Sequence, residues 1–288
     1  MISASMGGRD HSPCPALLQG RAASSAPLPA HWCLMPGAGI WPCVGVPGGF
    51  DVASFLDEFA GLAGQKGFTR RILCETAAGP LLAWERLDGE PPAYVSAGMH
   101  GDEPAGPLAA LELLRSGALD EGSWLLCPAL NPAGLAAGTR ENPEGIDLNR
   151  DYLNRSSLEV RHHAAWMENL PCPRLFVSLH EDWESTGFYF YEINLDEDRP
   201  ERAASILKAV EPWFPAEPAT LIDEHEIRSA GWIYHVPEAD MPTDWPEAIF
   251  LAKRGCPVSF TFETPSANCL HDRTAAHVAA VKAALAFR

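Results

Sequence analysis

Tyr94-Val95-Ser96-Ala97-Gly98-Met99-His100-Gly101-Asp102-Glu103 is the most informative segment of this 288-residue chain. The apolar run Tyr94 to Ala97 predicts a strand, and Pro104 to Leu114 predicts a helix with proline in its first turn. His100 and Glu103 therefore fall on the bend between strand and helix. Both side chains can converge on one point beyond the end of a sheet, where ligands usually bind in an open α/β fold.

A second apolar run, Leu175 to Leu179, ends in the same way with His180. Two imidazoles and one carboxylate suit a catalytic zinc ion that keeps one position open for water or substrate. A His-x-x-Glu pair alone is a weak signal, and both histidines could instead be satisfied core residues at strand ends. The third candidate ligand favours a metal site, and hence a metallohydrolase.

The segment between these ligands is long and polar. Asn131 to Arg140 and Gly145 to Tyr152 place two arginines and an asparagine on a predicted loop, and such loops carry function more often than packing. Further on, the alternating segment Val258 to Pro265 predicts a strand that ends in Glu263.

Five separated motifs, in their order along the chain, resemble those of the zinc carboxypeptidase superfamily. This superfamily includes the succinylglutamate desuccinylase and aspartoacylase branch. The resemblance covers roughly Val95 to Glu263. It implies a single-domain α/β fold of the zinc carboxypeptidase (phosphorylase/hydrolase-like) type. Strands interleaved with helices along the chain independently predict a mixed β-sheet with helices on both faces.

The resemblance also implies a zinc hydrolase with one zinc ion, held by His100, Glu103 and His180. It implies that Arg140 polarises the scissile carbonyl and that Glu263 is the general base. A carboxylate in that position can take a proton from water and later give it to the leaving amine. Alternatively, Glu263 could pair with a lysine or cap the turn that follows it.

Asn149 and Arg150 are expected, by the same resemblance, to bind a substrate carboxylate. A guanidinium binds a carboxylate through two parallel hydrogen bonds and stays charged. Arg150 could instead be a structural partner of Asp147 or Asp151. Tyr234 is the best candidate for the mobile, substrate-binding tyrosine of classical carboxypeptidases, although its neighbours match no family pattern.

Acidic residues flank the predicted ligands, and one of them could orient a ligand imidazole through its second ring nitrogen. The sequence does not choose among them. They are Asp102, Glu181, Asp182 and Glu184.

The chain has a formal net charge of −17, which argues against nucleic acid and anionic membranes as partners. A zinc ion and two arginines would still form a local positive site for a small anionic substrate. No apolar run is long enough to predict a membrane span. The eight cysteines show no C-x-x-C spacing, which favours free thiols in a reducing compartment such as the cytoplasm.

Residues 1–50 are rich in Ala, Gly, Pro and Ser and predict a loosely ordered extension, whereas residues 51–288 predict the zinc carboxypeptidase-like catalytic domain. Further helices and strands are expected between the motifs and at the end of the chain. The helices are 52–63, 157–169, 199–213 and 272–287; the strands are 70–75, 81–87, 123–127 and 187–193.

We therefore expect a hydrolase that cleaves an amide bond next to a free carboxylate in a small peptide, as a small metallocarboxypeptidase or peptide amidase does. A deacylase of N-acyl amino acids and an inactive metal-binding module are the alternatives. Aspartoacylase-like members carry an extra carboxy-terminal β domain, but only Thr264 to Arg288 follow Glu263 here. That difference favours the peptidase-like architecture.

Overall fold

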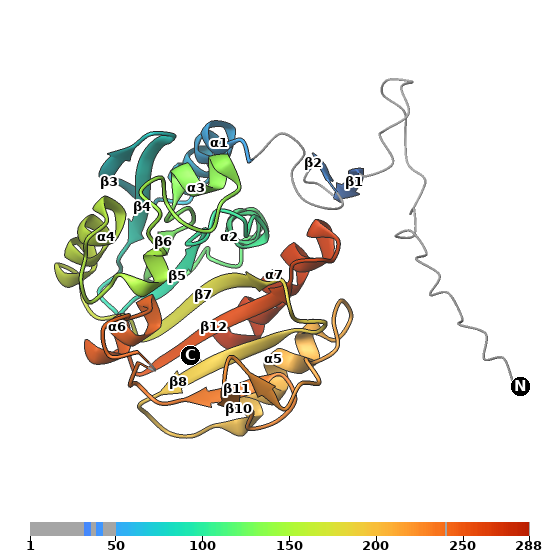
Figure 1. Cartoon of the computed structure of the whole chain (residues 1–288). Helices are drawn as coiled ribbons and strands as arrows, with labels where there is room; N and C mark the ends of the chain where they lie inside the picture. Colours follow the sequence, from blue (N-terminus) through green and yellow to red (C-terminus); the bar gives the residue numbers. More distant parts are fainter. Residues whose placement is uncertain (1–31, 36–38, 43–49, 240, 288) are drawn as a thin grey trace, which may run out of the picture.

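The computed structural model describes residues 32–35, 39–42, 50–239 and 241–287. An eight-stranded mixed sheet runs through the middle of the molecule (Figure 1). In spatial order its strands are β11 (Trp232–His235), β8 (Tyr189–Asn194), β12 (Val258–Pro265), β7 (Leu175–Asp182), β5 (Ala93–Ala97), β6 (Trp124–Cys127), β4 (Gly79–Arg86) and β3 (Thr69–Thr76). The pairs β12·β7, β7·β5, β5·β6 and β11·β8 are parallel, and the others are antiparallel.

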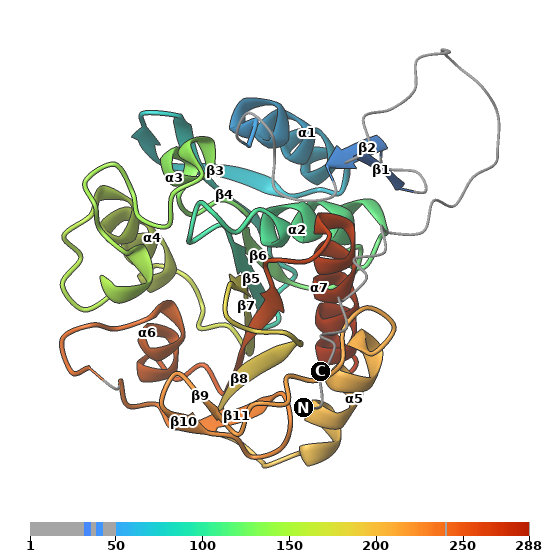
Figure 2. The same cartoon turned by 45° about the vertical axis from the view of Figure 1, so that its right-hand side comes forward.

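Helices cover both faces of this sheet, as Figure 2 shows. One face packs against α1 (Val52–Gln65), α2 (Ala105–Arg115), α5 (Pro200–Val210) and α7 (Leu270–Leu285). The other face packs against α4 (Leu158–Glu168) and α6 (Glu247–Lys253). The expected mixed α/β architecture is confirmed. Among the described residues, no helix combines the length and apolar character needed to cross a membrane.

Strand β5 shows how the sequence builds this arrangement. All five of its residues are buried, so it lacks the polar positions of a strand with one solvated face. Val95 and Ala97 contribute to the core under α1, α2, α5 and α7, whereas Tyr94 contributes to the core under α4 and α6. The predicted metal-binding motif thus begins on a strand that is packed on both faces.

The segment 131–140, predicted as a loop, contains a short helix, α3 (Pro132–Ala137). The Asn131 side chain accepts a hydrogen bond from the Gly134 amide at 2.8 Å and so caps the helix, and proline follows at its first position. Gly138 ends it with φ of 67°. The prediction of an irregular loop was wrong here, although all three helix signals are present in the sequence.

Short elements complete the chain. A 3₁₀ turn, η1 (Leu148–Arg150), carries two of the predicted substrate-binding residues, and β9 (Leu221–Ile222) and β10 (His225–Glu226) form a small hairpin. In the predicted amino-terminal extension, β1 (Trp32–Met35) pairs antiparallel with β2 (Gly39–Pro42). The rest of that prediction lies outside the described residues.

Gly101 marks the closest approach between the metal-binding bend and α3. A Cβ atom at Gly101 would lie 1.9 Å from the carbonyl carbon of Gly134, far inside van der Waals contact. The Gly101 amide also donates to the carbonyl of Thr139 at 2.9 Å. Glycine is therefore required between His100 and Glu103 because two backbone segments touch there.

Candidate active site

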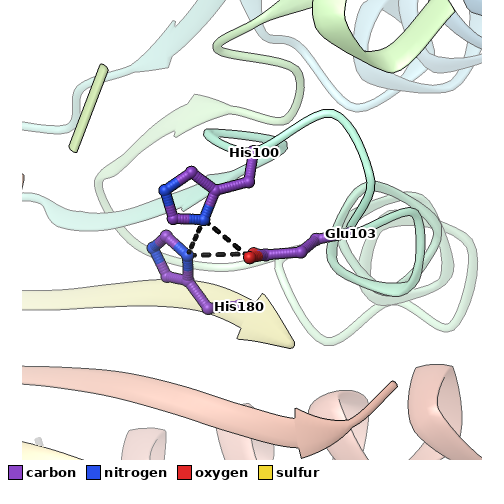
Figure 3. A group of neighbouring side chains, drawn as sticks. All are labelled: His100, Glu103 and His180. Atoms are coloured by element: carbon purple, nitrogen blue, oxygen red, sulfur yellow. Dashed lines mark hydrogen bonds and ion pairs between the residues drawn. The ribbon is translucent and has the colours of Figure 1, made fainter. Parts of the chain in front are cut away.

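His100, Glu103 and His180 converge at the carboxyl ends of β5 and β7 (Figure 3). The His100 Nδ1 atom lies 2.6 Å from Glu103 Oε1, and the His180 Nδ1 atom lies 3.0 Å from Glu103 Oε2 and 3.3 Å from His100 Nδ1. Tetrahedral zinc with bonds of about 2.0–2.1 Å requires its ligand atoms to be roughly 3.3 Å apart. The donor set and its spacing therefore fit a zinc ion.

The three side chains are almost completely buried. Burial lowers the pKa of His100, but Glu103 and Asp147 outweigh it and raise that pKa to about 9. For His180 burial prevails, and its pKa is lowered. Burial opposes ionisation of Glu103, yet the two histidines hold its pKa well below the usual range. The ionised Glu103 carboxylate thus lies between two imidazoles, a set of donors that suits a cation. A cation that binds there must displace the proton that the histidines hold.

Asp147 orients the His100 ring, a role that the sequence analysis did not assign to it. Its Oδ1 atom lies 3.2 Å from His100 Nε2, and its Oδ2 atom accepts a hydrogen bond from Arg140 Nε at 3.1 Å and forms an ion pair with Arg140 Nη2 at 3.0 Å. Burial would raise the pKa of Asp147, but His100 and Arg140 hold it well below its usual range. A carboxylate on the second ring nitrogen is the common support of a metal-binding histidine.

The flanking acids proposed for that role are engaged elsewhere. Glu181 accepts a hydrogen bond from the Ala105 amide at 2.7 Å and forms an ion pair with Arg273, so it joins β7 to α2 and α7. Asp182 accepts from the Tyr189 hydroxyl at 3.1 Å. Asp102 and Glu184 line the neighbouring cavity without a hydrogen bond to either imidazole.

Glu263 lies beside the His100, Glu103 and His180 cluster on β12, where it is the register partner of His180. The described residues offer its carboxylate no hydrogen bond or ion pair, and it lines the cavity. Burial raises the pKa of Glu263 well above its usual range, and the carboxylates of Glu103, Asp182 and Asp223 add to the effect. These observations contradict the alternative that Glu263 pairs with a lysine.

A cavity of about 660 Å³ adjoins this cluster and brings together seven of the eight predicted site residues. They are His100, Glu103, Arg140, Asn149, Arg150, His180 and Glu263. The side chain of Arg140 reaches to 3.6 Å from Glu103 and is 42% exposed, so its guanidinium faces the cavity beside the metal ligands.

Asn149 and Arg150 extend from η1 into the same cavity. The Asn149 Oδ1 atom accepts a hydrogen bond from the Glu247 amide at 3.0 Å, which leaves its NH₂ group as a donor. Arg150 is exposed and forms no ion pair with a described residue. Asp147 forms ion pairs with His100 and Arg140, and Asp151 accepts hydrogen bonds from the Ser156 and Ser157 hydroxyls. Neither acid therefore forms an ion pair with Arg150, although the charge of Arg150 helps to lower the pKa of Asp147.

Tyr234 is the predicted site residue that the structure does not bring to the cavity. Side chains alternate along β11, and His235 lines the cavity, whereas Tyr234 packs against Trp232 on the opposite face, with ring centroids 6.1 Å apart. The Arg228 guanidinium covers its ring at 4.8 Å. Two other tyrosines, Tyr189 and Tyr191 on β8, line the cavity instead.

A chain of buried polar side chains lies behind the active site, between the sheet and helices α4 and α6. The Glu247 carboxylate accepts hydrogen bonds from the Ser96 hydroxyl at 2.7 Å and the Tyr94 hydroxyl at 2.8 Å. The Tyr94 oxygen lies 2.7 Å from His163 Nε2, and His163 Nδ1 lies 2.9 Å from the Tyr152 hydroxyl. Burial raises the pKa of Glu247 to about 7 and lowers that of His163 to about 3.

Part of the chain matches a known protein family. Residues 90–214 match the succinylglutamate desuccinylase/aspartoacylase catalytic domain. No protein with a curated description matches the chain.

Among solved structures, a candidate metallopeptidase from Shewanella amazonensis SB2B has 25% identity and a TM-score of 0.72, over 82% of this chain and 93% of that one. One from Shewanella denitrificans OS217 has 24% identity and a TM-score of 0.72, over 82% and 90%. A metallo-carboxypeptidase from Burkholderia cenocepacia has 17% identity and a TM-score of 0.57, over 82% and 67%. The matched catalytic domain and the shared fold together support a place for the chain in the zinc carboxypeptidase superfamily, which includes the succinylglutamate desuccinylase/aspartoacylase branch.

Proposed function

We propose that the protein is a zinc-dependent hydrolase that cleaves an amide bond next to a free carboxylate, as a small metallocarboxypeptidase or peptide amidase does. The observation that carries this proposal is the position of Glu263, whose carboxylate has no partner among the described residues and lies on the strand next to the His100, Glu103 and His180 cluster. A zinc ion held by these three residues would supply the Lewis acidity that activates water for attack on an amide carbonyl.

The residues around the cluster have the properties that this chemistry needs. Glu263 has a raised pKa, which suits a group that first accepts a proton from water and then donates it to the leaving amine. Arg140 is held beside Glu103 by Asp147, so its guanidinium is positioned to stabilise negative charge on the carbonyl oxygen. Arg150 Nη1 donates to the Asn149 carbonyl at 3.0 Å, and the other N–H groups of its guanidinium, together with the Asn149 side-chain amide, can donate to a substrate carboxylate in the cavity.

The match of residues 90–214 favours a second candidate, a deacylase of N-acyl amino acids. The charges around the cavity disfavour a substrate with several carboxylates, because the cavity is lined by two arginines and nine carboxyl side chains. The arginines are Arg140 and Arg150; the acids are Asp102, Glu103, Glu181, Asp182, Glu184, Asp223, Glu224, Asp244 and Glu263. Arg140 already pairs with Asp147, so Arg150 is the cation left for one substrate carboxylate.

The test is to incubate the zinc-loaded protein with two substrate sets and measure the free amino acid released. One set contains short peptides with free or amidated carboxyl ends, and the other contains N-acetyl and N-succinyl amino acids. Release from free-ended peptides supports the peptidase. Release only from N-acyl amino acids supports the alternative, and no release from either set, with zinc bound, favours an inactive binding module. His100→Ala protein, which should lack zinc, is the control for contaminating hydrolases.

A further inference from the structure

Glu247 connects the two halves of the active site without touching the cavity. Its side chain reaches the metal-binding strands, and its backbone reaches the loop that carries Asn149 and Arg150. The neighbours Pro246 and Ala248 line the cavity, but Glu247 does not, and it is 1% exposed. A carboxyl group buried to this degree opposes folding unless its hydrogen bonds are satisfied, so its presence calls for a role.

On the metal side, both carboxylate oxygens are bonded to β5. Ser96 and Tyr94 each donate to one of them, and Ser96 lies four residues before His100. The Ser96 hydroxyl also lies 3.2 Å from that of Ser178 on β7, two residues before His180. These bonds fix the start of α6 relative to both strands that carry metal ligands.

On the substrate side, the Glu247 amide donates to Asn149 Oδ1 at 3.0 Å. This bond determines which way the Asn149 amide group is turned, because its oxygen faces Glu247 and its NH₂ group is then directed away as a donor. A second bond, from the Tyr152 amide to the Trp245 carbonyl at 3.2 Å, joins the same two segments. The Asn149–Arg150 pair is thus held by the residues at the start of α6.

We propose that Glu247 is a positioning residue, which keeps the carboxylate-binding pair Asn149 and Arg150 in register with the metal-binding strands. The proposal rests on the proposed function for its kinetic consequence, but the coupling itself is a property of the fold. Substrate atoms at the metal and at Arg150 must be bound at a fixed separation, and a displacement of about 1 Å can cost on the order of 10²-fold in rate.

The experiment uses Glu247→Gln, which keeps the side-chain volume but leaves one acceptor where two are needed. Glu217→Gln is the matched control, because Glu217 is also a buried carboxylate, and it accepts hydrogen bonds from the Thr186 and Gly187 amides and not from the Asn149 loop. Ser96→Ala removes one bond to Glu247 without changing Glu247 itself, and it serves if Glu247→Gln does not fold. Metal content is measured for every variant.

Two measurements are made on each zinc-loaded variant. Amide hydrogen exchange at Tyr152 reports whether the loop has loosened, and it needs no substrate. The ratio of kcat/KM for a free-ended peptide to that for its amidated form reports how much the enzyme gains from the carboxylate. We expect Glu247→Gln to speed exchange at Tyr152 and to lower this ratio roughly tenfold, with full zinc and little change in Glu217→Gln.

Each outcome has a distinct meaning. Unchanged exchange in Glu247→Gln overturns the proposal, whatever the activity. Faster exchange with an unchanged ratio also overturns it, because Glu247 is then merely structural. Faster exchange in a protein whose wild type hydrolyses no peptide leaves the coupling supported and rejects the peptidase function instead.

Discussion

His180 and Glu263 are register partners on the neighbouring parallel strands β7 and β12. Register partners in parallel strands point to the same face of the sheet, and the strands are about 4.8 Å apart. The separation of a metal ligand from the proposed base is therefore set by the backbone ladder of the sheet, and a change in a surface loop does not alter it.

The metal site is tested by replacing its imidazoles. We expect His100→Ala and His180→Ala proteins to lose their zinc, because two remaining ligands cannot close the site. Metal analysis of purified protein measures the loss, with His271→Ala on α7 as the control, because His271 lies outside the cluster. Full zinc occupancy in both ligand variants would reject the assignment.

Glu263→Gln should retain zinc and lose most of its turnover. The amide has nearly the same shape but cannot accept a proton, and loss of a general base typically costs about 10² to 10⁴ in rate. Steady-state kcat and metal content are measured together, with Glu184→Gln at the cavity rim as a control for lost charge. If the variant keeps nearly all its turnover, the base is another carboxylate, and Glu181 is the first to examine.

Arg150→Ala and amidation of the substrate carboxylate should each lower kcat/KM by about 2 to 4 kcal/mol of transition-state stabilisation. Applied together they should cost little more than either one, because both remove the same charge-assisted contact. The four kcat/KM values of this cycle provide the measurement. Additive losses would show that Arg150 acts away from the carboxylate.

Gly101→Ala tests the backbone contact between the metal-binding bend and α3. The added methyl group would overlap the Gly134 backbone, so we expect a loss of about 3 kcal/mol or more in unfolding free energy, together with weaker zinc binding. Gly61→Ala on α1 is the matched control, since nothing lies within 4 Å of its added Cβ. Urea unfolding measures the free energy of unfolding of each variant, and equal stability of the two variants would refute the contact.

The stability contribution of Glu247 should depend on pH. Burial raises its folded-state pKa from 4.5 to about 7, so the folded protein binds a proton that the unfolded chain has released. Wild-type stability should therefore fall relative to Glu247→Gln as pH rises from about 4.5 to about 7, by roughly 3 kcal/mol in total. Unfolding free energies at several pH values measure this difference; a constant difference contradicts the raised pKa.

The sequence predicted the parts of the site that depend on local pattern. Strand, bend and helix signals placed His100 and Glu103 correctly, and a strand end placed His180. Asp147 was named only as a partner of Arg150, because its true contact, His100, lies 47 residues away in the chain. Tyr234 was chosen because it lies upstream of Glu263 in the chain, whereas alternation along β11 decides which face of the sheet it occupies.

Helix α6 makes contacts of a kind that the sequence did not predict. Glu247 and Asn149 are 98 residues apart, and a glutamate at the start of a seven-residue helix gives no local sign that it is buried. Its hydrogen bonds to Ser96 and Tyr94 become visible only when β5 is placed beneath it. Contacts of this kind depend on the packing of whole layers, which periodicity does not encode.

The buried chain from Tyr152 to Glu247 has a direction, because each hydroxyl carries one hydrogen. While Glu247 is ionised, Tyr94 donates to it, so His163 must donate from Nε2 and accept from Tyr152 at Nδ1. When Glu247 takes up a proton and donates it to the Tyr94 oxygen, the same hydrogen bonds can be kept only if every donor in the chain becomes an acceptor. The neutral His163 then changes tautomer, with its proton on Nδ1. One ionisation thus reverses the polarity of a hydrogen-bonded path that begins two residues beyond Arg150, and the ¹⁵N shifts of His163 would record the reversal.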